Sequence, residues 1–591
     1  MEYPEKLLNI ISEILSGDKE NFTGMTAIEL EPVKIDYKSV KSILIIQFSA
    51  FGDVIITNSL LDILKKKFNV SLLTYKKNSG IAANSITKIE ADESAILTGD
   101  KKLIFLLFQK IADAVNSLKF DLIINLHPSE YSAVLSACFN PQFFLGQKYD
   151  ASRNKIAAHF DYSFYLKYFT EYFSQLSANP YNYPLADLYR ILSQIDFSGF
   201  VDEPASGKKT YREKSYNIVV CPGGKWESKL WHYKKFADLI NLISDDYPEY
   251  SFFITGDVSE KKLIENIYEL CFQKEKIVLN SGDITLSELK RRILESAFTI
   301  TNDTSILHLS NYLNVPAILL ISSTKTVPFG DNIIIAADRN CCGCMKKICP
   351  KNINCINHIS SEFVYEVVSA FIKSNCSVAE SLKKLYEIQV SENIRKIYYT
   401  ISNDTDAYKL RFQYPVKTDF PDEKKITDDV LYFASLDSLS QNRVLSPEEK
   451  NLIINSIVGR IKRIYQDYNI NPVKLNKTAS ELLSELECIR AELNKLIKTA
   501  IRLNEKNFNE YFETCEIIEL KLSRLKTYNL LVKPYDIILY EFAEDDEKTL
   551  NLNKMKKYLE KIKISVKIKK AVAENIFFIF KAAIENLCVS L

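Results

Sequence analysis

The sequence predicts an α/β protein in which two doubly wound domains face a cleft and an all-α extension follows them. Two series of apolar runs alternate with helical stretches, a polar linker at residues 200–215 separates the series, and helical periodicity takes over after residue 376. Such alternation is typical of buried parallel strands joined by crossover helices. We therefore expect four parts, residues 1–38, 39–205, 206–375 and 376–591.

The composition is ordinary for a globular protein. Hydrophobic residues make up 47% and charged residues 26%, and 76 basic residues balance 75 acidic ones. These values exclude collagen-like and disordered chains and give no support for a nucleic-acid-binding surface. Glycine is scarce, with 15 in 591 residues, and only Gly459 follows Gly343.

The N-terminal segment has no basic lead and no small-residue cleavage site, and no stretch reaches the ~18 uncharged apolar residues of a membrane span. We expect a cytoplasmic chain without a transmembrane segment, and peripheral contact with the inner membrane stays open. In that compartment cysteines are reduced thiols or metal ligands rather than disulfides.

The two α/β series can be followed along the chain. Residues 1–38 predict a short amphipathic helix closed by Gly17 and then a polar connector. From Ser42 the run SILIIQFSAFGDVIITNSLLDILKKKFNVSLLTY predicts strand, helix and strand, and FDLIINLH adds another strand. The second series has strands in NIVVCPGG, YSFFITGD, KIVLNSGD, FTITND and AILLISS, and Thr285 with Glu288 forms a capping box.

The last 216 residues, 376–591, predict helices and contain no catalytic constellation. Ser446, Pro447 and Glu449 mark a helix start, and Thr478 with Glu481 repeats the capping box. A heptad seam follows, made by Leu482, Leu486, Ile489, Leu493, Leu496, Ala500 and Leu503. This seam fits the inside of a helical bundle, with homo-oligomerisation or partner docking as the alternatives.

Three strand-to-helix turns carry residues suited to chemistry. In CPGGKWESKLWHYKKFADLI, Gly223 and Gly224 let a ligand approach the backbone, and Lys229 can neutralise a diphosphate. The alternative is a glycine turn with solvated lysines. In SAFGDVIITNS, Asp53 follows Gly52 and is placed to act as a general base, although many such aspartates only cap helices.

The third turn lies in TITNDTSILHLSNYLNVPAILL. Asp303, Thr304 and Ser305 fall between a strand and a helix, where free amides and the helix dipole favour anions, and His308 lies one turn further on. The alternative is a simple helix cap followed by a structural histidine.

In order and spacing, these segments resemble the bacterial ADP-heptose glycosyltransferases, or heptosyltransferases, including the branch that modifies autotransporter proteins. The resemblance covers residues 40–375. Its matches are IIQFSAFGDVIIT with Thr57, FDLIINLH with Gly146, Lys229 with Trp231, Gly256 with Glu260, and Asp303, Thr304, Ser305 and His308 followed by Pro316. Ser305 stands where the family has glycine, and Ser59 where it has proline.

The resemblance implies a GT-B fold of two Rossmann-like domains, with the acceptor at the first and the nucleotide sugar at the second. It implies an inverting transfer that needs no divalent metal, in which Asp53 deprotonates the acceptor hydroxyl and Lys229 stabilises the leaving diphosphate. The residues expected to bind the nucleotide sugar are Gly223, Gly224, Lys229, Gly256, Glu260, Asp303, Thr304, Ser305 and His308.

We expect an ADP-heptose-like donor, with a lipid-linked saccharide or a protein hydroxyl as acceptor and a slight preference for the protein. Two alternatives stay open. One is a GT-B enzyme that uses a UDP-sugar. The other is a degenerate binding or assembly module without transferase activity. Ser305 leaves this alternative open, because the resembled family has glycine at that position.

A cysteine-rich stretch, residues 341–358, ends the second domain. Cys341, Cys344, Cys349 and Cys355 have a spacing that suggests a structural zinc or iron site, with Cys342 left over. The resembled family often carries cysteines here, and its protein-modifying branch holds iron. The alternative is unliganded thiols.

Overall fold

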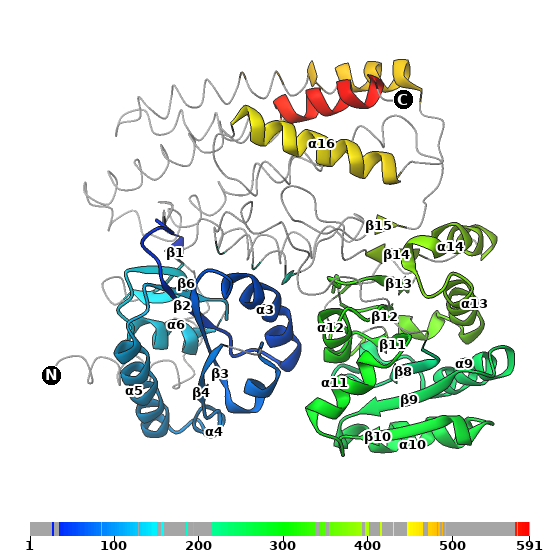
Figure 1. Ribbon diagram of the computed structural model, residues 1–591, viewed down its shortest axis with the longest axis horizontal. Helices are drawn as coiled ribbons and strands as arrows, with labels where there is room; N and C mark the ends of the chain where they lie inside the picture. Colours follow the sequence, from blue (N-terminus) through cyan, green and yellow to red (C-terminus); the bar gives the residue numbers. More distant parts are fainter. Residues whose placement is uncertain are drawn as a thin grey trace. The chain divides into compact units, whose positions relative to one another are not determined.

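The computed structural model describes most of residues 35–150 and 215–400 and smaller parts of the rest (Figure 1). The described residues are 27–28, 35–83, 86–127, 129–150, 155–158, 185–186, 189, 193, 215–324, 326–337, 343–344, 346–349, 351, 354–392, 396–400, 414–415, 430, 446–464, 471–481, 483–484, 487, 491, 574–575 and 577–589. The chain divides into two compact units, Met1–Thr405 with Lys409–Val416, and Asp406–Tyr408 with Lys417–Leu591. Both α/β domains belong to the first unit.

The first domain is built on a seven-stranded sheet of order β1-β7-β6-β5-β2-β3-β4. The strands β2 to β6 pair in parallel, whereas β7 runs antiparallel to β6. The strands are β1 (Ala27–Ile28), β2 (Ser42–Ile46), β3 (Asn69–Tyr75), β4 (Thr87–Ala91), β5 (Leu122–Asn125), β6 (Phe143–Asp150) and β7 (Lys155–Ala158). The helices are α3 (Phe51–Leu64), η1 (Lys76–Ile81), α4 (Ser94–Thr98), α5 (Lys101–Leu118) and α6 (Glu130–Ala137).

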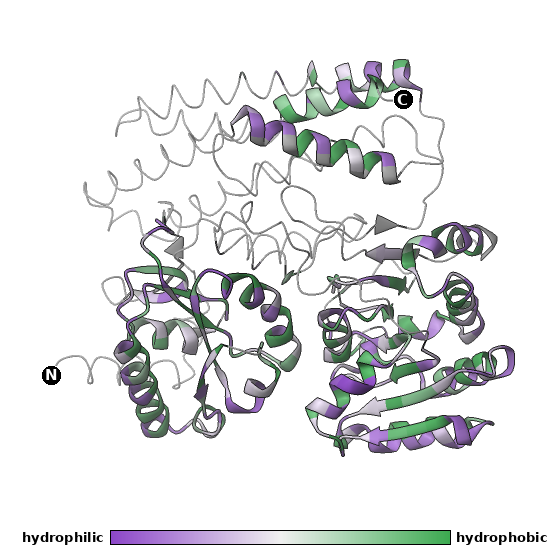
Figure 2. Cartoon of the chain, viewed as in Figure 1, coloured by the Kyte–Doolittle hydropathy of each residue, from purple (hydrophilic) through white to green (hydrophobic). Residues whose placement is uncertain are grey.

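The helix α5 shows how the sequence fixes the core of this domain. Its buried residues Ile104, Phe108, Ile111 and Val115 recur at helical spacing, and the Asp100 carboxylate caps its first turn by accepting from the amides of Lys102 and Leu103. Figure 2 shows hydrophobic and hydrophilic stretches alternating along this helix, as expected when one face is buried against a sheet.

The second domain is an eight-stranded sheet of order β10-β9-β8-β11-β12-β13-β14-β15. Its first six strands in this order pair in parallel and the last two are antiparallel. The strands are β8 (Asn217–Cys221), β9 (Ser251–Gly256), β10 (Ile277–Ser281), β11 (Phe298–Asn302), β12 (Ala317–Ile321), β13 (Asn332–Ala336), β14 (Lys396–Thr400) and β15 (Tyr414–Pro415).

Helices cover both faces of this sheet (Figure 1). The helices α11 and α12 lie on one face, and α9, α10 and α13 lie on the other. Their bounds are η3 (Glu227–Lys229), α9 (Tyr233–Asp246), η4 (Val258–Glu260), α10 (Lys261–Leu270), η5 (Lys274–Lys276), α11 (Leu286–Leu294), α12 (Ser305–Tyr312), η6 (Cys355–His358), α13 (Ser361–Ile372) and α14 (Val378–Glu392). The predicted pair of Rossmann-like α/β domains is therefore confirmed.

The strand order places a topological switch point in each sheet. In the second sheet, β8 and β11 are neighbours although two strands separate them in sequence, and in the first sheet β2 and β5 are related in the same way. Ligands of such sheets bind outside the carboxyl ends of the strands at a switch point. The turns with Asp53, Gly223 and Asp303 follow β2, β8 and β11, so all three lie where a ligand is expected.

The two switch points are linked by direct packing of α3 on α12. The Tyr312 hydroxyl of α12 donates a hydrogen bond of 3.0 Å to the Asp62 carboxylate of α3. The helix that begins beside Asp53 is therefore in contact with the helix that begins at Ser305.

Gly146 lies within β6, where a Cβ would overlap the backbone of Asn125. One local expectation needs correction. Thr478 lies inside the helical residues 472–481 and donates to the Lys474 carbonyl, so it does not start a helix. Asn471 caps that helix instead, because its side chain accepts from the amides of Val473 and Lys474.

The segment after residue 375 contributes to the second sheet as well as to helices. The strands β14 and β15 pair on its edge. Within the second unit, α16 (Pro447–Ile464) starts where Ser446 and Pro447 predicted a helix start. The heptad seam from Leu482 to Leu503 lies almost wholly outside the described residues, as do the linker at 200–215 and the N-terminal helix. No helix in the described ranges is long and apolar enough to cross a membrane.

Candidate active site

Asp53 lies in the first turn of α3, directly after the switch-point strand β2. Burial raises the pKa of its carboxyl, the Ala50 amide that donates to it lowers the pKa, and the charge of Asp303 raises it further. The net pKa is above the ordinary value of 3.8. Asp53 is not the cap of α3, whose N-cap is Ala50 without a side-chain cap hydrogen bond. Its raised proton affinity suits a general base.

Lys229 and Asp303 form a nearly buried ion pair in the second domain. Lys229 Nζ lies 2.8 Å from Asp303 Oδ2 and 4.7 Å from the centre of the Trp226 ring. Burial alone would raise the pKa of Asp303, but Lys229 and then His308 lower it below its ordinary value. Asp303 therefore stays ionised and fixes the ammonium group of Lys229, which also acts electrostatically on Asp53.

His308 lies where α12 meets α3. A Cβ on Gly52 would lie 2.9 Å from His308 Cδ2 and 3.7 Å from Ser305 Cα, so glycine is needed for this close approach. Burial lowers the pKa of His308 despite the nearby charge of Asp303. Its Nδ1 is buried and has no hydrogen-bond partner within the described structure, which disfavours a purely structural histidine whose polar atoms are all satisfied.

Thr304 is the N-cap of α12, as one of the sequence alternatives proposed. Its hydroxyl accepts from the Ile306 amide and lies 3.1 Å from the hydroxyl of Thr301. Asp303, in contrast, is engaged by Lys229 and does not cap the helix.

Glu260 is held in a cradle of glycines. Its carboxylate accepts from the amide of Gly224 at 2.6 Å and from the amide of Asp257 at 2.9 Å. A Cβ on Gly223 would overlap this carboxylate, and a Cβ on Gly256 would lie 2.6 Å from it. The Glu260 side chain thus accounts for glycine at both positions, where the sequence suggested the approach of a ligand.

A polar group at the carboxyl end of β5 was not recognised from the sequence. The Ser49 hydroxyl lies 2.7 Å from His127 Nδ1, and burial lowers the pKa of His127 to about 4. The imidazole is therefore neutral at pH 7. The only signal in the sequence was that His127 ends a predicted strand.

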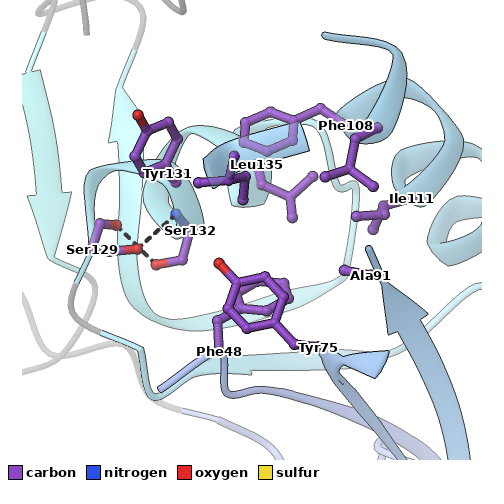
Figure 3. A pocket seen from close by; sticks show the side chains of 11 residues that line it. Phe48, Tyr75, Ala91, Phe108, Ile111, Ser129, Tyr131, Ser132 and Leu135 are labelled. Atoms are coloured by element: carbon purple, nitrogen blue, oxygen red, sulfur yellow. Dashed lines mark hydrogen bonds between the residues drawn. The ribbon is translucent and has the colours of Figure 1, made fainter. Parts of the chain in front are cut away.

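Figure 3 shows a small cavity in the first domain, and its lining residue Phe48 meets the His127 ring edge-on with the ring centroids 5.9 Å apart. Phe48, Tyr75, Phe108 and Leu135 are among the residues that line it, and the Ser129 and Ser132 hydrogen bonds lie at one side. Its volume of about 10 Å³ is near the minimum for a single water molecule, so it cannot hold a sugar in this conformation.

Two further positioning side chains were also missed. The buried Asn302 donates to the carbonyls of Pro222 and Gly223 at 2.7 and 3.3 Å and so joins the turns after β8 and β11. Ser228, next to Lys229, makes several hydrogen bonds in the interior. The sequence signal for Asn302 was its place directly before Asp303. No sequence signal marked Ser228.

The predicted metal ligands are only partly described. Cys344 is exposed, Cys349 is half-buried and Cys355 is buried. Among the described residues, no three His, Cys, Asp or Glu side chains are arranged to hold a metal ion. These three thiols therefore do not form a metal site by themselves, and Cys341 lies outside the described residues.

The structure thus groups the predicted site residues into two sets. Asp53, Lys229, Asp303 and His308 interact with one another through charge or contact. Gly223, Gly224, Gly256 and Glu260 form the adjoining cradle. Together the sets offer a buried base, a fixed cation and a helix N-terminus at neighbouring switch points.

The chain is similar to known proteins. Residues 108–353 match the family model described as glycosyltransferase family 9 (heptosyltransferase). Lipopolysaccharide heptosyltransferase 1 of Campylobacter coli is 25% identical over 345 residues, which cover 55% of this chain and 97% of that protein.

Two solved structures are similar. The glycosyl transferase family 9 protein from Veillonella parvula has a TM-score of 0.45 and 19% identity, and the match covers 58% of this chain and 99% of that one. The E. coli heptosyltransferase WaaC with ADP has a TM-score of 0.37 and 14% identity, and the match covers 56% of this chain and 98% of that one. The family match and the curated relative confirm the predicted resemblance and the prediction of a glycosyltransferase.

The glycine cradle yields a prediction. Gly223→Ala should displace the Glu260 carboxylate and leave the amides of Gly224 and Asp257 without a partner. We expect the free energy of unfolding to fall by about 1–3 kcal/mol, measured by urea denaturation. Gly80→Ala is the matched control, because its Cβ would meet its nearest neighbour at an ordinary 3.6 Å.

In a Glu260→Ala background the same substitution should cost clearly less, because the overlapping carboxylate is gone. An equal cost of Gly223→Ala in both backgrounds would show that Glu260 does not require the glycine.

Proposed function

Because the chain carries a glycosyltransferase family 9 (heptosyltransferase) domain, we propose that it transfers a heptose-like sugar from an ADP-sugar to a hydroxyl acceptor with inversion at the anomeric carbon. The observation that carries the proposal is the convergence of Asp53, Lys229 and the start of α12 at the switch points of two packed sheets. The donor class rests on the sequence resemblance and on the curated heptosyltransferase relative.

The proposed reaction is a direct displacement. The Asp53 carboxylate takes the proton of the acceptor hydroxyl, and the acceptor oxygen forms a bond to the anomeric carbon. The bond from that carbon to the diphosphate oxygen breaks, and its electron pair leaves with ADP. A general base with a raised pKa binds the proton more readily in the transition state.

Lys229 and the first amides of α12 would stabilise the departing diphosphate. A helix N-terminus and a fixed ammonium group are both suited to developing negative charge in a site shielded from water. Asp303 holds the ammonium in place before substrate binds, so little reorganisation is needed during the reaction. Ser305 presents its backbone at this helix start, in the position where the resembled family has glycine.

The acceptor is a lipid-linked saccharide or a protein hydroxyl. The segment 376–591, which lies beyond the resemblance, and the cysteine-rich stretch slightly favour a protein. The cytoplasmic location, a peripheral contact with the inner membrane and an oligomer formed through the C-terminal helices remain predictions from the sequence.

A thermal-shift panel of ADP-, UDP-, GDP- and CMP-linked sugars tests the donor. A ligand that binds only the native state at 100 times its Kd stabilises it by about 2.7 kcal/mol. We expect ADP-heptose to raise the Tm by several degrees and the other donors to raise it less. A larger shift with a UDP-sugar would overturn the donor assignment, and no shift with any sugar nucleotide would favour a binding module.

Asp53→Asn should reduce turnover at least a hundredfold while the Kd for ADP changes little, because the amide cannot accept the proton. In the native protein, kcat/KM should fall as the pH drops through the raised pKa of Asp53, since only the ionised carboxylate is a base. The acidic limb of the profile should therefore lie above the ordinary value of 3.8. Full turnover by Asp53→Asn would refute the role of the base.

Elemental analysis tests the predicted metal. Protein purified without chelators should contain about one zinc or iron atom per chain, as expected for a four-thiolate site. Cys344→Ser should lower that content, whereas Cys271→Ser, a buried thiol elsewhere in the same domain, should not. Protein that contains neither zinc nor iron would refute the metal site and show that the cysteines are unliganded thiols.

A further inference from the structure

The turn that carries Lys229 is held by a distant part of the chain. We name the described residues within 343–359 the cysteine segment, since Cys344, Cys349 and Cys355 lie in it. Ser228, which is 3% exposed, donates its amide to the Lys347 carbonyl at 3.2 Å and its hydroxyl proton to the Lys346 carbonyl at 2.6 Å. One side of η3 is therefore fixed to the cysteine segment.

The same serine is also fixed to the end of β12. Its hydroxyl lies 2.8 Å from the Ser323 hydroxyl, and its carbonyl accepts from the Ser322 hydroxyl at 2.8 Å. The Gly343 amide in turn donates to the Ser322 carbonyl. The amide, carbonyl and hydroxyl of Ser228 are thus all engaged, and buried networks that are fully satisfied in this way are rigid.

The residues that follow η3 are fixed to the end of the cysteine segment. Trp231 Nε1 donates to the Ile359 carbonyl at 2.8 Å, and the His232 amide donates to Asn357 Oδ1 at 2.9 Å. The ammonium of Lys235 donates to the Asn357 carbonyl at 2.7 Å. Residues 228 and 231 therefore hold the backbone on either side of Lys229.

We infer that the cysteine segment braces the Lys229 turn for sugar transfer and that Ser228 is the positioning residue through which it acts. This inference rests on the proposed function, in which Lys229 stabilises the leaving diphosphate. A lysine side chain has four rotatable bonds, so its ammonium is placed accurately only where the backbone beneath it is fixed. Displacement by about 1 Å can cost up to a hundredfold in rate.

Loss of the Ser228 hydroxyl should also be visible at Asp53. Burial and the charge of Asp303 raise the pKa of Asp53, whereas the Ala50 amide and Lys229 lower it. If Lys229 moves away from this group, the pKa of Asp53 rises further and the acidic limb of the kcat/KM profile moves to higher pH. A loss of stability alone would not produce this displacement.

The experiment compares Ser228→Ala with wild type and with Ser374→Ala in the full-length chain, by release of ADP from ADP-heptose. Ser374 is the matched control, a buried serine whose hydroxyl donates to the Ala370 carbonyl and accepts from the Lys384 ammonium, neither of which belongs to η3. We expect Ser228→Ala to lower kcat about tenfold, to change KM less than threefold, and to move the acidic limb upward. Ser374→Ala should leave all three unchanged.

Combination with Lys229→Met shows whether Ser228 acts through the lysine. If it does, adding Ser228→Ala to Lys229→Met causes little further loss of kcat. If the loss of kcat in the double variant equals the product of the two single losses, the residues act independently and the inference is overturned.

Fluorescence gives a readout that does not depend on turnover. The chain has two tryptophans, of which Trp231 is buried and Trp226 is half-buried beneath the Lys229 ammonium. Acrylamide quenching therefore reports mainly on Trp226, and it should increase in Ser228→Ala and not in Ser374→Ala. Unchanged quenching together with unchanged kcat in Ser228→Ala would overturn the brace.

The two proposals fail in different ways. Full turnover by Lys229→Met would refute the role of the lysine in the proposed function. Increased acrylamide quenching in Ser228→Ala would still show that Ser228 holds the Lys229 turn. An impaired Lys229→Met beside a wild-type-like Ser228→Ala would refute only the brace.

Discussion

The ion pair between Lys229 and Asp303 is the interaction on which the candidate site depends. Its partners come from turns after β8 and β11, which the strand order makes neighbours. A buried charge that loses its partner is costly, by roughly 3–5 kcal/mol, so neither residue is easily replaced alone. The pair also links the two domains electrostatically, because both of its charges act on Asp53 at the start of α3.

Close approach explains the few glycines at the site better than ligand access does. Gly52 lets α3 approach His308, and Gly223 and Gly256 leave room for the Glu260 carboxylate. Glycine therefore stands where a Cβ atom would overlap a neighbouring element of the protein. The amides of Gly224 and Asp257 are already satisfied by Glu260, so under the proposed function the start of α12 is the better place for the diphosphate.

Much of the fold was predictable, because apolar strands that end in Gly-Gly, Asn-Asp or Gly-Asp turns predict both the sheets and the edge that carries the site. Asp53, Lys229 and Asp303 were predicted as site residues in the same way, and the structure places them within one charge group. The contacts of Ser228 and the pairing of Ser49 with His127 were not predictable, because they join residues 118 and 78 positions apart, and a single sequence gives no measure of such distances. Thr478 shows the opposite error, a capping pattern that occurs within a helix.

The brace on Lys229 has a consequence for the order of folding. Its hydrogen bonds span 118 residues from Ser228 to Lys346 and 128 residues from Trp231 to Ile359. Contacts of such long sequence separation form late, since loop closure must precede them. A chain emerging from the ribosome can therefore build β8 to β12 while the turn of Lys229 is still incomplete. The turn that carries Lys229 is completed only once residue 359 has been synthesised.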